Sequence, residues 1–299
     1  MFNDLSKVIL LSDMDGTLLN SRKQINETDM AAIEKFRSLG GKFTIATGRT
    51  IQTFEQYAET LKLTMPVIMY NGAALYDYSR GEILYSRALP DGCCEMAEEL
   101  LRQMPEAGGE VLRADSTYVF SNTEYQQLHT KLCGITPEYA ELGAIPQGGW
   151  LKILFAMSPE DISYLEILVK QLKFNERADF VRSSTIFLEM LPKGVSKGSA
   201  LEAYRELDGM SEYTFAAIGD FDNDIEMIKA ADFGVCPANA EESVKKAADH
   251  VLSRTNDEGA VAELIDHIIA ECGIMNENLS SQENHVDFQV NFAEDMEKI

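Results

Sequence analysis

The sequence has few basic residues and no long apolar run. Its 26 lysines and arginines stand against 49 aspartates and glutamates, which gives a formal net charge of −23 at pH 7. So acidic a chain lacks the cationic surface that nucleic acids and anionic membranes require, and we expect neither as a partner. No apolar stretch approaches the roughly 18 residues of a membrane-spanning helix, and the first residues do not resemble a secretory signal.

The cysteines are too few and too scattered for a disulfide framework. There are five of them, Cys93 and Cys94 are adjacent, and no pair has the CxxC spacing. Reduced thiols are the simplest interpretation, and they favour a cytoplasmic location.

The length and the apolar pattern predict an α/β fold. A chain of 299 residues is long enough for about two domains. Short apolar runs that end in polar residues or glycine alternate with segments of helical spacing, which predicts a doubly wound, mostly parallel sheet. We expect strands at 8–11, 42–46 and 66–70 and helices at 26–39 and 51–61. In such sheets ligands bind at the carboxyl ends of the strands.

The alternation of strands and helices stops after residue 74 and resumes after Pro192. Between them we expect a hairpin over 75–89, helices at 95–104, 124–132 and 160–172, strands at 111–120, 151–157 and 187–191, and loops at 106–109 and 145–149. Beyond Pro192 we expect helices at 196–207, 224–231, 241–248 and 257–270 and strands at 215–218 and 233–235. The sequence therefore predicts a core of residues 1–80 and 192–272, an inserted α+β cap of residues 81–191, and an acidic tail of residues 273–299. In the tail, Phe288, Val290 and Phe292 could add an edge strand.

Four features are expected together at the carboxyl edge of the sheet. They are the Asp13/Asp15 pair, Thr47, Lys197 at the start of its helix, and Asp220 with Asn223 and Asp224. Taken singly, each has an ordinary explanation as a turn, a helix cap or a solvated charge. Taken together, the carboxylates would repel one another unless a cation neutralised them, and oxygen ligands without histidine or cysteine favour Mg²⁺. With Lys197 and Thr47 to bind an anion, the set indicates phosphoryl transfer.

The motifs that carry these residues resemble those of a known superfamily. Asp13-Met14-Asp15-Gly16-Thr17-Leu18 matches the DxDGTL motif of the haloacid dehalogenase-like superfamily. Three further stretches resemble its Cof-type branch, which carries an α/β cap between the second and third motifs: Thr47-Gly48-Arg49 with Asn71-Gly72-Ala73, Gly194-Val195-Ser196-Lys197-Gly198, and Gly219-Asp220-Phe221-Asp222-Asn223-Asp224. The resemblance covers roughly residues 7–270.

The resemblance implies a Mg²⁺-dependent phosphatase with these residues in named roles. Asp13 would attack phosphorus, and Asp15 would act as general acid and base. The implied metal ligands are Asp13, Asp15 (through a backbone carbonyl), Asp220 and Asp224, and the implied substrate contacts are Thr47, Gly48, Asn71, Lys197 and Asn223. The implied substrate is a small phosphorylated metabolite. A sugar phosphate is the preferred class, and flavin or pyridoxal phosphates are the second choice.

Other interpretations stay open at the level of the sequence. A phosphosugar mutase could share this cap, and a non-catalytic phosphate-binding regulator could pair acids, threonine and lysine on a similar sheet. Asp222 and Cys236-Pro237 depart from the branch pattern, and the cap bases Arg113, Lys152 and Arg182 could meet a second anionic group. The chain could be a monomer or a homodimer.

Overall fold

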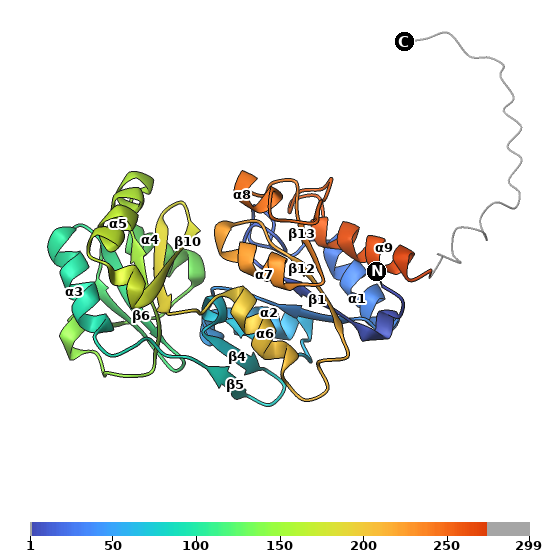
Figure 1. Ribbon diagram of the computed structural model, residues 1–299, viewed down its shortest axis with the longest axis horizontal. Coiled ribbons are helices and arrows are strands. Elements are labelled where there is room, and N and C mark those ends of the chain that lie inside the picture. The colour runs from blue at the N-terminus through green and yellow to red at the C-terminus, as the bar shows by residue number, and fades with distance from the viewer. Residues whose placement is uncertain (1, 274–299) are drawn as a thin grey trace, which may run out of the picture.

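The apolar run after Lys7 forms β1 (Val8–Ser12), a strand of a parallel five-stranded sheet (Figure 1). The structure is a computed structural model and describes residues 2–273. The sheet has the order β14-β13-β12-β1-β2, formed by β2 (Lys42–Ile45), β12 (Thr214–Ile218), β13 (Phe233–Cys236) and β14 (His250–Val251). All of its neighbouring strands pair in parallel, as the alternating pattern predicts.

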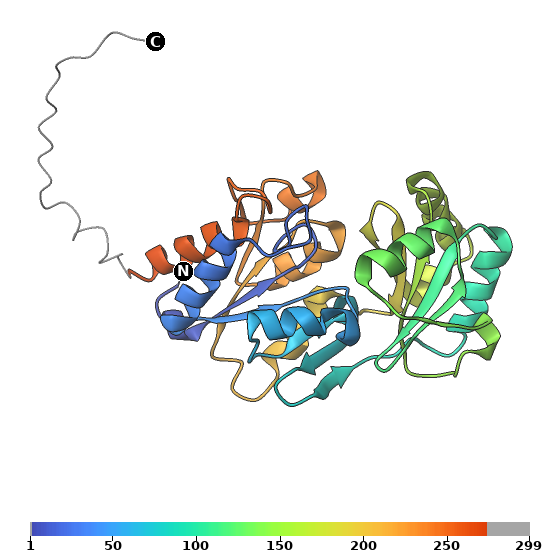
Figure 2. The same cartoon turned by 180° about the vertical axis from the view of Figure 1, so that it is seen from behind.

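Helices cover both faces of this sheet, which explains why β1 is buried throughout. Val8 and Leu10 pack in one hydrophobic cluster with α1 (Glu27–Ser38) and α9 (Ala260–Glu271), whereas Ile9 and Leu11 pack in another with α6 (Lys197–Arg205). Figures 1 and 2 show α1, α9 and α2 (Ile51–Leu61) on one side and α6 and α7 (Ile225–Ala230) on the other. The doubly wound α/β fold expected from the sequence is confirmed.

A small antiparallel sheet continues the core beyond β2. It consists of β3 (Val67–Met69), β4 (Ala74–Asp77) and β5 (Glu82–Ser86), and a parallel bridge between Ala46 and Ile68 joins it to the end of β2. The hairpin expected over 75–89 is present. Residue 81, the expected boundary between core and cap, lies in the turn between β4 and β5.

The inserted segment forms a second, separate sheet of six strands. Its order is β10-β11-β9-β6-β7-β8, from β6 (Gly108–Arg113), β7 (Thr117–Ser121), β8 (Glu138–Tyr139), β9 (Trp150–Ala156), β10 (Ala178–Ser184) and β11 (Phe187–Pro192). Pairing is antiparallel except between β7 and β8. The helices α3 (Cys93–Gln103), α4 (Glu124–Cys133) and α5 (Pro159–Gln171) complete the expected α+β cap.

The two faces of the cap sheet serve different purposes. Trp150, Ile153 and Phe155 pack in the cap's own hydrophobic cluster together with residues of α3 and α5. Leu112 and Leu154 belong instead to the cluster that includes the core sheet. The second face therefore looks toward the carboxyl edge of the core, where the site is expected.

Several expected elements differ in the structure. The single strand at 111–120 is wrong: the chain turns over 114–116, where Arg113 N donates to Ser116 O, and forms β6 and β7. Gly108 and Gly109, expected in a loop, begin β6. The strands β8, β10 and β14 were not expected, the helix at 241–248 shortens to α8 (Glu242–Lys245), and the helix at 224–231 splits into a 3-10 turn (Asp222–Asp224) and α7.

Short 3-10 turns complete the described part of the chain, at Leu5–Lys7, Tyr70–Gly72, Leu142–Ala144 and Phe174–Glu176. Within residues 2–273, no helix is both long enough and apolar enough to cross a bilayer. The edge strand expected around Phe288, Val290 and Phe292 lies outside the described residues.

A buried carboxyl joins α1 to α9 and gives a testable pH dependence. Asp29 is fully buried, and its Oδ1 accepts a hydrogen bond of 2.8 Å from Ala262 N in the first turn of α9. Burial raises the pKa of Asp29 to about 6, above its value in the unfolded chain, although the charge of Arg254 opposes the shift. The native state therefore favours the protonated form, and the stability contributed by this group is lost as the pH rises through about 4 to 6.

We expect the wild type to lose up to about 3 kcal/mol of unfolding free energy relative to Asp29→Asn between pH 4 and pH 7. Urea denaturation of both proteins across this range measures the difference, and effects of other titrating groups cancel in the comparison. A difference that stays constant with pH would contradict the prediction.

Candidate active site

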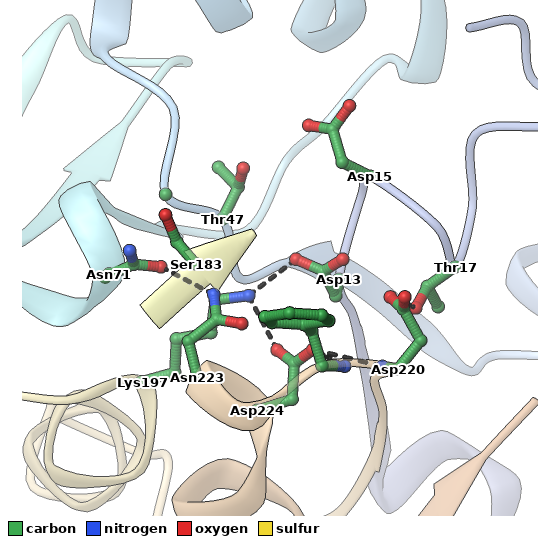
Figure 3. A network of polar contacts seen from close by, with 12 residues as sticks. Asp13, Asp15, Thr17, Thr47, Asn71, Ser183, Lys197, Asp220, Asn223 and Asp224 are labelled. Carbon is green, nitrogen blue, oxygen red and sulfur yellow. Dashed lines mark hydrogen bonds and ion pairs between the residues drawn. The ribbon is translucent and has the colours of Figure 1, made fainter. Parts of the chain in front are cut away.

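Asp13 lies at the carboxyl end of β1, held there by the sheet itself. Its backbone N donates to Ile218 O at the end of β12, so the two neighbouring strands fix the turn from which the side chain projects. The side chain is almost fully buried. Figure 3 shows it facing side chains from the loop after β12 and from the start of α6.

Lys197 is the buried cation of the site. Ser196 caps α6, with its hydroxyl accepting from Ser199 N, and this cap makes Lys197 the first residue of the helix. Its Nζ lies 2.5 Å from Asp13 Oδ1 and 2.6 Å from Asp224 Oδ1. Burial opposes its charge, but these two carboxylates raise the pKa of Lys197, so it stays an ammonium.

The loop after β12 places the remaining carboxylates. Asp224 Oδ2 accepts from the backbone N of Asp220 at 3.0 Å and of Phe221 at 3.2 Å, which closes the loop on itself. Thr17 Oγ1 donates to Asp220 Oδ1 at 2.7 Å and ties this carboxylate to the loop after β1. Because Asp224 binds both the backbone of this loop and Lys197, its side chain links the loop after β12 to the start of α6.

Asp13, Asp220 and Asp224 form a cluster that fits a hard cation. One carboxylate oxygen from each lies within 4.8 Å of the others. Burial, together with the neighbouring carboxylates, raises the pKa of Asp220 to about 7 and the pKa of Asp13 well above its usual range. Lys197 balances only part of this charge, so an oxygen-liganded divalent cation is the group that suits the donor set.

Gly16 is required by this crowding. It adopts a φ of +90°, and a Cβ there would lie 2.3 Å from Asp220 Oδ2. The backbone of the Asp15–Gly16 turn therefore approaches the Asp220 carboxylate as closely as only glycine permits.

The carboxylate of Asp15 points away from this cluster (Figure 3). Arg49 Nε and Nη2 lie 2.9 Å and 3.0 Å from its two oxygens, and Lys23 Nζ lies 2.8 Å away. Its side chain is 41% exposed, and although the cavity partly desolvates the carboxylate, these two cations hold the pKa of Asp15 at about 2. The structure thus separates the two acids of the DxD pair. Of the four expected metal ligands, it brings together the side chains of Asp13, Asp220 and Asp224, and the side chain of Asp15 lies apart from them.

Thr47 and Gly48 follow β2 and line the same cavity as Asp13. The hydroxyl of Thr47 is buried and accepts from Arg49 N at 3.2 Å. The carbonyl of Gly48 accepts from Lys152 Nζ of the cap at 2.7 Å. The expected phosphate-binding loop is therefore in direct contact with the cap.

Asn71 and Asn223 lie beside each other and are linked to the cap. Asn223 Nδ2 donates to Asn71 Oδ1 at 3.0 Å, and Asn71 Nδ2 donates to Glu189 Oε2 at 2.7 Å. The expected contacts thus surround one site, with Glu189 as a partner that the sequence did not reveal.

The sequence interpretation missed the partners that hold the site residues. The carboxylates of Asp15 and Asp220 are held by Thr17, Arg49 and Lys23. Thr17 and Arg49 lie in the DxDGTL and Thr-Gly-Arg motifs, which could have indicated them, whereas no motif indicated Lys23. Of the cap bases expected near a second anion, Lys152 lines the cavity, whereas Arg113 binds the carbonyls of Pro146 and Gly148.

The remaining unusual residues have structural partners. Arg182 pairs with Glu166 at 2.8 Å, outside the cavity, so it is not available for a second anion. Asp222 accepts from Ser243 Oγ at 2.5 Å, and Cys236 is fully buried in a hydrophobic cluster.

The site combines an aspartate, a buried lysine and two further acids at the carboxyl edge of a parallel sheet, under a cap. This combination defines a class of enzymes that transfer phosphoryl groups. The chain belongs to the haloacid dehalogenase-like hydrolases, since the model of that family matches residues 10–265. The resemblance to this superfamily and to its Cof-type branch is confirmed.

Named relatives of the chain are phosphatases. It is 31% identical over 243 residues to the 5-amino-6-(5-phospho-D-ribitylamino)uracil phosphatase YcsE of Bacillus subtilis, covering 81% of this chain and 88% of the relative. It is 26% identical over 256 residues to the pyridoxal phosphate phosphatase YbhA of Escherichia coli, covering 80% and 90%. The prediction of an enzyme of the phosphoric monoester hydrolase class is confirmed.

Solved structures share the fold. A haloacid dehalogenase-like hydrolase from Bacteroides thetaiotaomicron superposes with a TM-score of 0.74 at 29% sequence identity, over 88% of this chain and 99% of that one. Core and cap are therefore both found in a relative of known structure.

Proposed function

We propose that this chain is a Mg²⁺-dependent phosphatase that hydrolyses a small phosphorylated metabolite through an aspartyl-phosphate on Asp13. The observation that carries the proposal is the buried Lys197 held between Asp13 and Asp224, beside a third carboxylate. Such an arrangement combines a nucleophile, a fixed positive charge and a place for a divalent cation at one edge of the sheet.

Asp13 is the nucleophile in this proposal. Its Oδ1 accepts the hydrogen bond from Lys197, which leaves Oδ2 to attack phosphorus and displace the alcohol. Lys197 then lies next to the transferring phosphoryl group, and Thr47, which lines the cavity, offers that group a hydroxyl. Water hydrolyses the acyl phosphate in the second step, which releases inorganic phosphate and restores the carboxylate.

Asp15 is the proposed general acid and base. It would protonate the leaving oxygen in the first step and accept a proton from the attacking water in the second, so its proton balance closes over one turnover. A carboxyl with a pKa of about 2 holds no proton at neutral pH. The role therefore requires Asp15 to leave Arg49 and Lys23 when substrate enters.

Asp13, Asp220 and Asp224 would hold the Mg²⁺, together with the backbone carbonyl of Asp15. When bound, the ion supplies positive charge for the phosphoryl oxygens and for the crowded carboxylates. Asn223 and Asn71 would contact the substrate beside it.

The substrate is proposed to be a small phosphate ester because the cap lies over the site. The Lys152–Gly48 and Glu189–Asn71 hydrogen bonds close the cap onto the phosphate loop and leave little room for a macromolecule. The relatives act on a phosphoribitylaminouracil and on pyridoxal phosphate, as their names state, and both are compact esters. The sugar phosphate implied by the sequence resemblance stays a prediction.

Removal of the metal tests the proposal directly. We expect an aryl phosphate to be hydrolysed with Mg²⁺ and the rate to fall at least about 100-fold after EDTA treatment, because the carboxylate cluster then lacks its counter-charge. Phosphate release is the readout, and restored activity on adding back Mg²⁺ is the control. A folded protein without Mg²⁺-dependent release would refute catalysis, and isomer exchange without release would indicate a mutase.

A further inference from the structure

A continuous chain of polar contacts crosses from the cap to the core beside the cavity. Its centre is Glu189 of β11, whose Oε2 accepts from Lys152 Nζ of β9 at 2.8 Å and from Asn71 Nδ2 of the core at 2.7 Å. The other oxygen of Glu189 accepts from Ser183 Oγ at 2.7 Å. Asn71 Oδ1 in turn accepts from Asn223 Nδ2 at 3.0 Å (Figure 3). The chain of contacts therefore ends in the loop after β12, which carries the clustered carboxylates.

The ion pair at its centre is sealed from solvent. Lys152 and Glu189 are each 2% exposed, and Asn71 is 1% exposed. A buried ion pair contributes little to stability compared with apolar residues of the same volume, so packing alone does not account for it. Both members of this pair bind the core, since Lys152 Nζ also donates to Gly48 O at 2.7 Å. The pair therefore acts where the cap meets the phosphate-binding loop.

The chemistry of Glu189 dictates the direction of each hydrogen bond in the chain. A carboxylate paired with an ammonium offers only acceptors. Asn71 must therefore turn its amide nitrogen to the cap, and its oxygen then faces Asn223. Because that oxygen is also only an acceptor, Asn223 must turn its own nitrogen to Asn71. One carboxylate of the cap thus sets the polarity of two amides of the core.

The core by itself holds Asn71 in place without setting this polarity. The backbone of Asn71 has a φ of +54°, and its N donates to Thr47 O at 3.0 Å. Its amide packs against Gly48, where a Cβ would lie 3.0 Å from both Nδ2 and Oδ1. These contacts fix the plane of the amide, but nitrogen and oxygen are equally close to Gly48. The distinction between the two ends comes from Glu189.

Asn223 carries the effect into the site, because it lines the cavity together with Asp13 and Thr47. We infer that Glu189, held by Lys152, is a positioning residue for the phosphate end of the site: through Asn71 it fixes which end of the Asn223 amide is turned away from the cavity. The cap then acts on the phosphoryl group of every substrate, and not only on the leaving group. The inference rests on the proposed function, because that reaction defines the phosphate end.

Inorganic phosphate is the probe for this inference because it carries no leaving group. The double variant Lys152→Met/Glu189→Met replaces the ion pair by side chains of similar volume, which is the kind of change that buried pairs tolerate. It leaves Asn71 without its acceptor in the cap. We expect the Kd for phosphate with Mg²⁺, measured by calorimetry, to rise roughly 10- to 30-fold. The kcat/KM values for phenyl phosphate and for glucose 6-phosphate should fall by similar factors.

A reversal of polarity gives a signature that a structural role would not. Asn71→Asp places a second carboxylate against Glu189, and we expect kcat/KM to fall roughly 100-fold. Adding Glu189→Gln puts an amide nitrogen opposite the new carboxylate, which can still accept from Asn223. The hydrogen bond then returns with its direction reversed. We expect Asn71→Asp/Glu189→Gln to recover at least about 10-fold in kcat/KM over Asn71→Asp alone, which measures the coupling of the two side chains.

The matched control removes another ion pair of the cap. Arg182 and Glu166 lie 2.8 Å apart and outside the cavity. Arg182→Met/Glu166→Met should therefore keep the phosphate Kd and both kcat/KM values within about twofold of the wild type. Thermal unfolding of each variant establishes that it is folded.

Three results would overturn the inference. They are a wild-type phosphate Kd in folded Lys152→Met/Glu189→Met, a loss of kcat/KM confined to one of the two esters, and no recovery in folded Asn71→Asp/Glu189→Gln. Failure of the proposed function has a different signature, because folded wild type would then release no phosphate from either ester with Mg²⁺. In that case the phosphate Kd of the variants alone decides the inference, and a wild type that binds no phosphate removes both proposals.

Discussion

Asp13→Asn is expected to lower kcat by on the order of 10⁴-fold or more while the protein stays folded. The substitution keeps the shape of the side chain, and an amide Oδ1 can still accept the hydrogen bond from Lys197. It removes the charged oxygen that attacks phosphorus, for which neighbouring carboxylates are not placed to substitute. The measurement is steady-state phosphate release, with thermal unfolding of the same sample to establish that it is folded.

Asp222→Asn is the matched control for this change. Asp222 lies in the same loop as Asp220 and Asp224, but its carboxylate accepts from Ser243 and is not one of the clustered acids. We expect its activity to remain within about twofold of the wild type. Acid quenching during turnover adds a direct readout, because labelled phosphate should stay on wild-type protein and not on Asp13→Asn. Turnover of Asp13→Asn at a wild-type rate would refute the assignment of the nucleophile.

The convergence of the site could be predicted because it follows from topology. Asp13 and Asp220 each follow a strand of the parallel sheet, and Lys197 begins α6, which packs against these strands on the same face as α7. Parallel strands end at one edge, so residues far apart in sequence had to meet there. The pairing of β1 with β12 is the contact that makes this argument hold.

The direction of the Asp15 carboxylate could not be predicted in the same way. The spacing of two from Asp13 gives its backbone position, but Gly16, with its positive φ, turns the chain directly after it. Its side chain then forms ion pairs with Arg49 and Lys23. Lys23 lies in a loop, and no periodicity in the sequence indicates the path of that loop.

The cap was predicted only in outline because its buried polar residues break the apolar pattern. Glu110 in β6 and Glu189 in β11 occupy buried positions where alternation would place apolar residues. The strand β10 has few fully buried side chains and reads as a loop. Ion pairs with His129 and Lys152 make these carboxylates tolerable inside the cap, and such pairs are formed by tertiary contacts that the sequence does not show.

Lys197→Met is expected to reduce both stability and activity more than any other lysine substitution within the described chain. The side chain is fully buried, and its removal leaves Asp13 and Asp224 facing each other without their shared cation. Breaking a buried ion pair from one side costs about 3–5 kcal/mol. We expect a loss of that size in unfolding free energy, and a fall in kcat on the order of 10³-fold because the phosphoryl group also loses its fixed positive charge.

Mg²⁺ distinguishes the two losses. In Lys197→Met the three clustered carboxylates lack their shared ammonium, so added Mg²⁺ should recover part of the unfolding free energy, whereas kcat should stay low because the ion cannot stand in the place of the ammonium. Lys193→Met is the matched control: its partly exposed pair with Asp179 should contribute less than about 1 kcal/mol, with no effect of Mg²⁺ on the difference. Denaturant unfolding with EDTA and with Mg²⁺ measures all three proteins. If Lys197→Met unfolded with the wild-type free energy in EDTA, the buried lysine would not be the cation that balances the site, and the argument that a divalent ion completes that balance would fail with it.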